Sequence, residues 1–331
     1  MSAPLVIRDA RHWKTGERVD VAIENGAILS VTPSAELTSG PNELDARGAI
    51  VAPGLVDLHV HLREPGQSAK ETIETGTRAA AAGGFTAVAC MPNTDPVLDS
   101  PAWIEWVLNR AREARHCRVH FAHLSCAESL EALRDAKRRG LAVTGETCPH
   151  YWVLTDEAVA DYDSHAKMNP PLRSERDRDA VLAAITDGTL DCVVTDHAPH
   201  TFEEKRQPFD LAPFGIAGLE TALALTITTL VQPGHLTLER ALELWTDGPR
   251  RVFNLPKVEL APGSPADLVL IDPDSTWTVD PEGFFSKGRN TPFAGWTLTG
   301  RVVATLCGGI VRHRDASAHS AAARERTGAA R

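Results

Sequence analysis

Residues 54–63 read GLVDLHVHLR, an apolar run that ends in two histidines one residue apart. Alternate residues of a β-strand point to the same face, so Asp57, His59 and His61 would share one face of a strand over residues 50–62. Two neutral imidazoles at a strand end can bind one Zn²⁺-type ion. For an isolated His-x-His pair, two polar residues at the solvent end of a strand are the commoner explanation. The surrounding sequence therefore has to decide between the two.

Downstream of this stretch, predicted strands alternate with predicted helices, which indicates a parallel sheet or barrel. Ser68 with Glu71, and Ser174 with Asp177, have the spacing of helix-capping pairs. Six strands fit into a region of about 210 residues, whereas an eight-stranded barrel typically needs about 250. We therefore predict a shortened α/β barrel over residues 53–261. The later strands are expected at 86–92, 117–125, 141–149, 165–171 and 190–196, and the helices at 68–82, 102–115, 127–139, 174–187, 217–231 and 238–247.

The two ends of the sequence differ from this central region. Residues 1–52 and 262–314 consist of short segments that alternate apolar and polar residues, separated by turn-forming residues. We interpret them as one small β domain that both ends of the chain build together. Residues 315–331 are small, polar and rich in Ala and Arg, so a disordered tail is expected there.

The composition is that of a soluble globular protein: 43% of the 331 residues are hydrophobic and 24% are charged. A formal net charge of −10 argues against general affinity for nucleic acid or anionic membranes. No signal peptide is recognisable, and no apolar stretch approaches the roughly 20 residues of a membrane-spanning helix. The six cysteines form no C-x-x-C pair, and several lie in apolar runs. Buried free thiols and a cytoplasmic location are therefore expected.

The residues around the two histidines carry a family resemblance. The stretch APGLVDLHVHLREPG (52–66) closely resembles the signature of dihydroorotases, which are cyclic amidohydrolases of the amidohydrolase superfamily. This resemblance implies a metal-containing TIM-type (β/α)₈ barrel with a small β domain made from both termini. It also implies reversible hydrolysis of L-dihydroorotate to N-carbamoyl-L-aspartate in pyrimidine (UMP) biosynthesis. The resemblance continues through residues 70–99, VHFAHLS (119–125), GETCPHY (145–151), NPPLR (169–173), VVTDHAPH (193–200), GIAGLET (215–221), GSPADLVLID (263–272) and NTPFAGWTLTGRV (290–302).

The resemblance assigns metal-binding and catalytic roles. It implies that His59 and His61 bind a first Zn²⁺ ion and that Asp196 is the general base and also contacts the metal. A metal lowers the pKa of the attacking water, and a nearby carboxylate can move its proton. His123 matches a ligand of a second metal position. His120 lies three residues earlier, so strand alternation would point it to the opposite face as a structural residue.

The substrate carries a carboxylate, for which a planar guanidinium is well suited. The resemblance implies that Arg63, Asn93 and His200 bind this carboxylate. It implies further that Asn169, Phe214 and Gly215 contact the ring, Phe214 through its backbone because the family commonly has Pro there. Without the resemblance, an Asn beside Pro is more simply a turn residue. His150 receives no ligand role.

The chain departs from the family pattern between about residue 115 and VHFAHLS. Two βα units of the family barrel have no counterpart there, in agreement with the strand count. In the family these units carry the carboxylate that bridges two metals and one histidine of the second metal. We therefore expect one Zn²⁺ ion rather than two.

The missing units leave several outcomes open. The barrel could close with fewer strands, or its exposed edge could pair with a second copy to form a homo-oligomer. The loss of ligands also permits a non-catalytic partner of aspartate carbamoyltransferase. GETCPHY would fit an allantoinase or hydantoinase as well, whereas HLREPG, MPNT and DHAPH favour a dihydroorotase.

Overall fold

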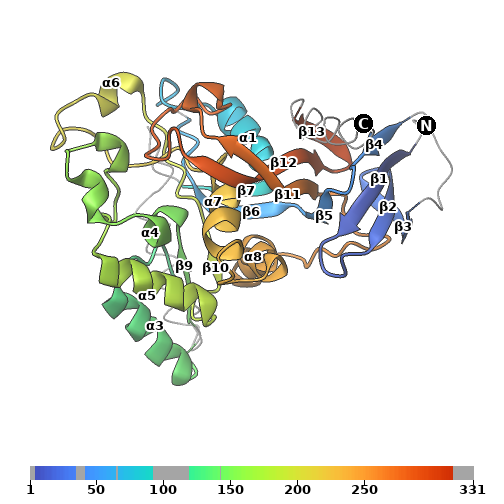
Figure 1. Ribbon diagram of the computed structural model, residues 1–331, viewed down its shortest axis with the longest axis horizontal. Coiled ribbons are helices and arrows are strands. Elements are labelled where there is room, and N and C mark those ends of the chain that lie inside the picture. The colour runs from blue at the N-terminus through green and yellow to red at the C-terminus, as the bar shows by residue number, and fades with distance from the viewer. Residues whose placement is uncertain (1–3, 35–41, 65, 92–118, 142, 316–331) are drawn as a thin grey trace, which may run out of the picture.

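The computed structural model describes residues 4–34, 42–64, 66–91, 119–141 and 143–315. At one end of the molecule lies an eight-stranded sheet that combines strands from both ends of the sequence (Figure 1). Its order is β13-β12-β11-β5-β1-β2-β3, with β4 beside β1. Strand β5 pairs with both β1 and β11 and so connects the strands from the N-terminal part of the sequence with those from the C-terminal part. The strands are β1 (Leu5–His12), β2 (Arg18–Glu24), β3 (Ala27–Pro33), β4 (Glu43–Asp45), β5 (Ile50–Pro53), β11 (Leu268–Thr278), β12 (Thr297–Cys307) and β13 (Ile310–Arg314).

This sheet has its own apolar core, which includes Ile7, Val21, Ile28 and Leu268. Strands β2 and β5 are buried at nearly all positions, whereas the second half of β11 alternates between partly buried and exposed residues. The backbone N–H of Asp315 still donates to the carbonyl of Val303 (2.9 Å). The remainder of the predicted tail lies outside the described residues.

The second part of the fold is an incomplete β/α barrel of parallel strands. Strand β6 (Leu55–Val60) pairs with β7 (Phe85–Cys90), and β8 (Val119–Phe121), β9 (Val143–Thr147) and β10 (Cys192–Val193) form a second parallel group. A parallel bridge between Val60 and His197 joins the two groups, and the N–H of His61 donates to the carbonyl of His197 (2.7 Å). The order within the described residues is thus β7-β6-β10-β9-β8.

The first and last strands of a closed barrel are neighbours, and β6 and β10 meet in this way here. Among the described residues, the two ends of the series are β7 and β8. These strands flank the part of the sequence where two βα units are missing. The predicted helix at 102–115 falls outside the described residues.

Helices surround the parallel strands (Figure 1). The indole of Trp245 is fully buried and packs edge-on against Phe85, with ring centroids 5.4 Å apart. At the far end of the molecule, the N–H of Ala127 donates to Asp177 (2.9 Å) and links two helices. The helical segments are α1 (Ile73–Ala82), α3 (Ala127–Arg138), α4 (Pro149–Val153), η1 (Asp156–Val159), η2 (Ser164–Ala166), α5 (Glu175–Thr186), α6 (Phe202–Lys205), α7 (Ala222–Thr226), the π-helix η3 (Ile227–Val231), α8 (Leu238–Trp245), α9 (Asp247–Phe253) and η4 (Pro281–Gly283).

Two local predictions were wrong. Helix α1 is capped by Thr72, whose side chain accepts from the N–H of Thr75, and not by Ser68 with Glu71. The carboxylate of Glu71 is instead buried in tertiary contacts. The predicted strand at 165–171 is replaced by the short helix η2, because this segment packs as a loop under the site. The Ser174 cap of α5 is confirmed.

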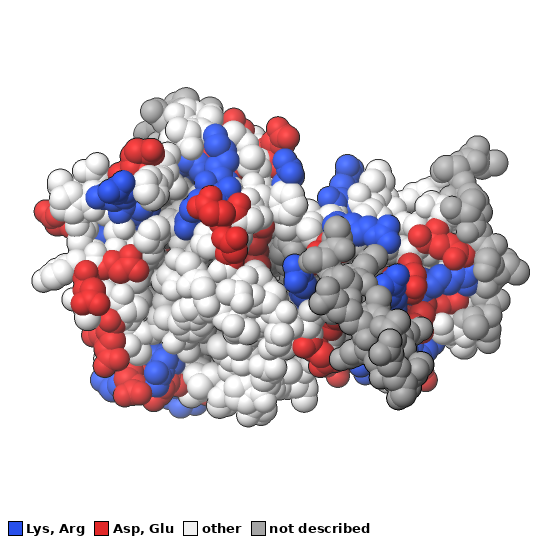
Figure 2. Space-filling view, turned by 45° about the horizontal axis from the view of Figure 1, so that its top comes forward, with Lys and Arg blue, Asp and Glu red and all other residues white. Residues whose placement is uncertain are grey.

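On the face shown in Figure 2, Lys and Arg side chains are interspersed with Asp and Glu around a broad area without charged residues. Within the described ranges, none of the helices has both the length and the apolar character needed to cross a membrane.

Candidate metal and substrate site

A cavity of about 390 Å³ lies where the carboxyl ends of the parallel strands converge. Every predicted site residue that the structure describes lines this cavity. Asn93 lies outside the described residues. The lining consists of His59, His61, Arg63, His123, Asn169, Asp196, Ala198, His200, Pro213, Phe214 and Gly215.

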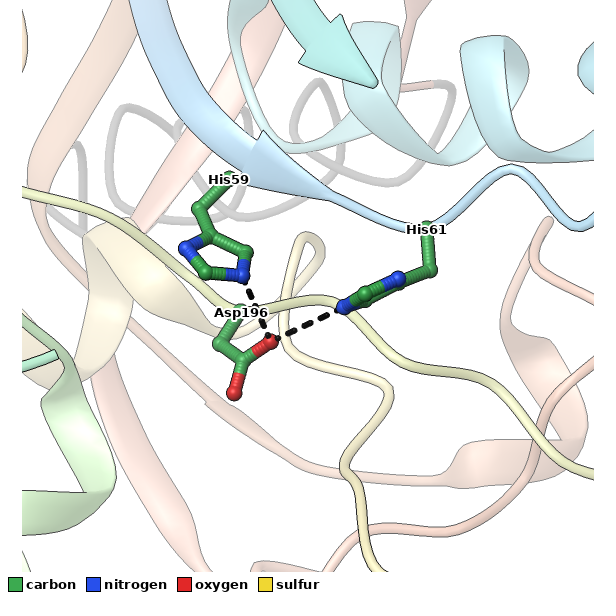
Figure 3. A group of neighbouring side chains, drawn as sticks. All are labelled: His59, His61 and Asp196. Atoms are coloured by element: carbon green, nitrogen blue, oxygen red, sulfur yellow. Dashed lines mark ion pairs between the residues drawn. The ribbon is translucent and has the colours of Figure 1, made fainter. Parts of the chain in front are cut away.

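Two imidazoles and a carboxylate converge at the floor of this cavity (Figure 3). The Nε2 atom of His61 lies 3.3 Å from Oδ1 of Asp196, and Nε2 of His59 lies 3.5 Å from the same oxygen. Ligand atoms around a tetrahedral zinc with bonds near 2.0–2.1 Å are about 3.3 Å apart. The three side chains therefore fit a metal with three protein ligands and one open position.

His123 is near this group but not part of it. Its ring centroid is 5.2 Å from that of His59. Burial lowers the pKa of His123, so its ring is neutral and has a lone pair available. Among the described residues, two groups of three ligand atoms lie mutually close: His59, His61 and Asp196 in the cavity, and His120, Glu146 and Cys192; His123 belongs to neither.

The charges of the group favour a bound cation. Burial by itself would lower the pKa of His59, but Glu146 and Asp196 raise it above the usual value. Burial would likewise raise the pKa of Asp196, but a hydrogen bond from His61 and the nearby His59 lower it. Asp196 is therefore ionised at neutral pH and can serve as a ligand and as a base.

Three predicted site residues have a left-handed backbone conformation, which L-residues adopt at an energetic cost. The φ angles are +62° at Arg63, +38° at His123 and +49° at Asp196. Such conformations persist only where surrounding contacts hold them, and they concentrate at functional sites.

The buried carboxylate of Asp57 provides part of this support. It accepts hydrogen bonds from the backbone N–H of His59 (3.0 Å) and of Thr195 (3.3 Å), and from the Thr195 hydroxyl. Burial raises the pKa of Asp57 to about 7. Asp57 thus ties the strand that carries His59 to the segment that carries Asp196.

A second buried carboxylate, Glu71, holds the residue after Asp196. His197 Nδ1 accepts from the N–H of Gly218 (3.2 Å), so the Nε2–H of His197 donates to Glu71 (3.3 Å). Glu71 also accepts from the Ser286 hydroxyl and from the N–H of Lys287 (3.1 Å). Glu71 also accepts from the N–H of Thr72 (3.4 Å) and from the Thr75 hydroxyl, so its carboxylate joins the start of α1 to these distant segments.

We expect Glu71→Gln to lower the free energy of unfolding at pH 7 by up to about 3 kcal/mol. Burial would raise the pKa of Glu71, but hydrogen bonds from His197, Ser286 and Thr75 lower it from 4.5 to about 2. A lowered pKa stabilises the fold above the unfolded value, so the difference should shrink as pH falls from about 4.5 towards about 2.

Urea unfolding of both proteins between pH 7 and pH 3 would measure this difference. A difference that stays constant down to pH 3 would contradict the explanation. Glu220→Gln is a matched control, because Glu220 accepts from Phe285 and Ser286 but burial raises its pKa to about 7. Its effect should have the opposite dependence on pH.

Arg63 and His200 lie side by side in the lining of the cavity. Arg63 Nε donates to the carbonyl of Pro199 (3.2 Å), and Nη2 lies 3.3 Å from Nε2 of His200. Burial and the charge of Arg63 lower the pKa of His200 to about 4, so the imidazole is neutral. Its Nδ1 lies 3.2 Å from Glu204 and its Nε2 lies 3.0 Å from the carbonyl of Phe214, and both of these groups can only accept.

Phe214 and Gly215 line the cavity next to His200. The Phe214 side chain is 52% exposed, while its carbonyl oxygen lies 3.0 Å from Nε2 of His200. The backbone of Gly215 is held by its N–H to Lys167 (2.9 Å) and by Asn290 Nδ2 to its carbonyl (3.0 Å). The wall therefore presents backbone groups to the cavity.

Glu146 is a buried residue of the site that was not predicted from the sequence. The Nε2 atom of His120 lies 2.8 Å from Oε2 of Glu146, whose Oε1 lies 3.4 Å from Nδ1 of His59. His120 was expected to be structural, and among the described residues it does not line the cavity, whereas His123 does. Glu146 stands in the GETCPHY stretch, which was the available signal.

His150 is another buried histidine near the group. It follows the end of β9, and its Nε2 has no hydrogen-bond partner among the described residues. Burial lowers its pKa to about 4, partly offset by the charge of Asp196.

Comparisons with known proteins agree with this geometry. Residues 48–163 match a family model described as dihydro-orotase-like. The dihydroorotase of Pelotomaculum thermopropionicum is 40% identical over 406 residues, which cover 90% of this chain and 95% of that protein. The dihydroorotase of Syntrophotalea carbinolica is 37% identical over 406 residues, with the same coverage. Among solved structures, an L-hydantoinase from Arthrobacter aurescens matches with a TM-score of 0.82 at 21% identity. The match covers 94% of this chain and 96% of the hydantoinase chain. It shares the fold.

The alignment lengths also bear on the missing units. An alignment over 406 residues is longer than this chain of 331 residues. The relatives therefore have residues that this chain lacks, as the interrupted family pattern and the low strand count indicated. With this internal deletion, the chain belongs to the dihydroorotase family.

Proposed function

We propose that this protein is a dihydroorotase that catalyses the reversible hydrolysis of L-dihydroorotate to N-carbamoyl-L-aspartate with one bound Zn²⁺ ion. The observation that supports this most directly is the convergence of His59, His61 and Asp196 beside Arg63 in one cavity. This reaction needs both a set of metal ligands and a group that binds the substrate carboxylate, and here both line the same cavity.

The metal would be held by His59, His61 and Asp196. When bound, it supplies a lowered pKa for the attacking water and polarises the scissile carbonyl. Asp196 takes a proton from the water while the water oxygen attacks the ring carbonyl carbon. The C–N bond of the ring then breaks, and Asp196 returns the proton to the departing nitrogen. Ring closure follows the same steps in reverse.

Arg63 would bind the substrate carboxylate. Its guanidinium is buried, and its Nε is fixed by the carbonyl of Pro199 (3.2 Å). Burial strengthens a charge-assisted hydrogen bond, and the fixed orientation reduces the entropy lost on binding. His200 lies beside this guanidinium, with its Nε2 3.3 Å from Nη2. Asn169, Asn93 and the backbone at Phe214–Gly215 are proposed to contact the rest of the substrate.

A single zinc ion fits the residues better than two. Around His59, the described part of the chain contributes one mutually close ligand set with three members. Among the described residues, His123 belongs to no group of three mutually close ligand atoms. Three protein ligands with an open position are the usual arrangement of a catalytic zinc.

We predict that chelation of the purified protein abolishes hydrolysis of dihydroorotate and that one equivalent of Zn²⁺ restores it. Metal content and the loss of the dihydroorotate absorbance should be measured on the same sample, since this links occupancy to turnover. The proposal would be refuted if this protein, purified without a chelator, contains no metal and does not hydrolyse dihydroorotate even after zinc is added.

The same assay separates the alternatives. A non-catalytic partner of aspartate carbamoyltransferase is favoured by the residues missing relative to the relatives, and it would bind that enzyme without hydrolysing dihydroorotate. A hydantoinase or allantoinase would act on rings that lack the carboxylate. We expect a strong preference for dihydroorotate over hydantoin and allantoin, because Arg63 is available for its carboxylate. We also propose a cytoplasmic location, for which the free cysteines Cys126, Cys148, Cys192 and Cys307 are the support.

A further inference from the structure

The two ring nitrogens of His59 each face a different carboxylate. Nε2 lies 3.5 Å from Oδ1 of Asp196, and Nδ1 lies 3.4 Å from Oε1 of Glu146. An imidazole nitrogen binds a metal only when it carries no proton, so the partner of the other nitrogen selects the binding form. An ionised carboxylate can only accept, and it therefore keeps the proton on Nδ1.

Glu146 is itself firmly held. It lies in β9, its side chain is 2% exposed, and its second oxygen accepts from Nε2 of His120 (2.8 Å). The other ring nitrogen of His120 contacts the hydroxyl of Thr144 (2.9 Å). The carboxylate is thus fixed between two imidazoles, one from β6 and one from β8.

We infer that Glu146 is a positioning residue for the metal ligand His59, and that His120 acts by holding Glu146 in place. Glu146 accepts from the Nδ1–H of His59 and so directs the Nε2 lone pair towards Asp196 and the metal. This inference rests on the proposed zinc site. Because the metal has only three protein ligands, misorientation of one of them should weaken its binding considerably. Groups that hydrogen-bond to a metal ligand typically contribute about 10- to 100-fold to metal affinity.

A competing explanation uses the same residues. Ligand atoms of His120, Glu146 and Cys192 lie within 4.8 Å of one another and could hold a metal of their own. In that case Glu146 would be a ligand of a separate site, and Cys192 would be equally necessary. The positioning role requires Glu146 and His120 but not Cys192. Substitution of Cys192 therefore distinguishes the positioning role from a separate metal site.

Competition of the full-length protein with a chelator of known zinc affinity tests the inference. We expect Glu146→Ala to weaken the binding of one zinc ion by about 10- to 100-fold. Glu146→Gln should have a smaller effect, because its amide oxygen can still accept from His59. Cys192→Ser is the matched control, since its buried thiol groups with His120 and Glu146 and not with His59, His61 and Asp196, and it should leave zinc affinity unchanged.

A second measurement reads the His59 ring directly in the zinc-loaded protein. Nitrogen chemical shifts should show Nδ1–H with Nε2 bound to the metal in the unsubstituted protein, and a mixture of both ring orientations in Glu146→Ala. If Glu146→Ala does not fold, His120→Gln, which removes the residue that holds Glu146, provides the comparison.

The outcomes are distinct. Unchanged zinc affinity and an unchanged His59 ring in folded Glu146 variants would overturn the positioning role and leave the proposed function intact. Loss of a bound metal in Cys192→Ser would also overturn it in favour of a separate site. If the unsubstituted protein binds no zinc, the proposed function itself fails, whereas failure of the positioning role alone leaves zinc binding by the unsubstituted protein in place.

Discussion

Asp196→Asn is expected to reduce kcat for dihydroorotate hydrolysis by about a thousandfold or more. The substitution keeps the shape of the side chain but removes the base and the charge that His59 and His61 face at 3.5 and 3.3 Å. Zinc affinity should fall as well. Both quantities should be measured on the same sample, with kcat determined at saturating zinc.

The two roles of Asp196 can be separated by this design. If saturating zinc restores kcat, Asp196 acts as a ligand only and another group must move the proton. Asp191→Asn is the matched control, because Asp191 precedes the same strand but pairs with Lys137 (2.7 Å) and accepts from the N–H of Gly145 (2.8 Å), away from the cavity. We expect it to lower stability without changing kcat.

Gly215→Ala is expected to have the second large effect. The φ of Gly215 is +134°, and a Cβ there would lie 2.7 Å from Cβ and 2.8 Å from the carbonyl oxygen of Ala198. Both the backbone conformation and the contact oppose a side chain. We expect a loss of about 3 kcal/mol or more in the free energy of unfolding. The KM for dihydroorotate should also rise, because the Phe214–Gly215 wall must move.

Gly188→Ala provides the comparison for this prediction. Its φ is +79°, but a Cβ there would meet nothing within 4 Å. It should therefore cost only about 1–2 kcal/mol, the penalty of the backbone conformation, and leave KM unchanged. Denaturant unfolding and steady-state kinetics of both variants decide the matter. Equal effects of the two substitutions would show that contact with Ala198 is not important.

Much of the candidate site could be predicted because its residues follow strand ends that have recognisable local sequences. His59 and His61 stand two apart after an apolar run, and Asp196 follows another. The expected metal-binding geometry then needs only that parallel strands end at the same edge. The shortage of strands was also readable, since the chain is too short for eight βα units.

Other features depended on contacts between residues far apart in the sequence. Glu71 has the spacing of a capping residue, yet its carboxylate bonds to Ser286, 215 residues later. The segment at 165–171 has apolar residues, but the carbonyl of Lys167 accepts from the N–H of Gly215 (2.9 Å) in a loop rather than in a strand ladder. In both cases a burial or pairing partner, absent from the local sequence, decided the conformation.

The sequence by itself determined which residues carry the chemistry: two histidines at one strand end, a carboxylate at another, and an arginine beside the first. The tertiary structure alone decided how they act together. The pairing of β6 with the segment after β10 brings His59 and Asp196 within 3.5 Å, and β9 places Glu146 behind His59. The physical reason is that local pattern specifies strands and their ends, whereas the choice of neighbour depends on how the whole barrel closes.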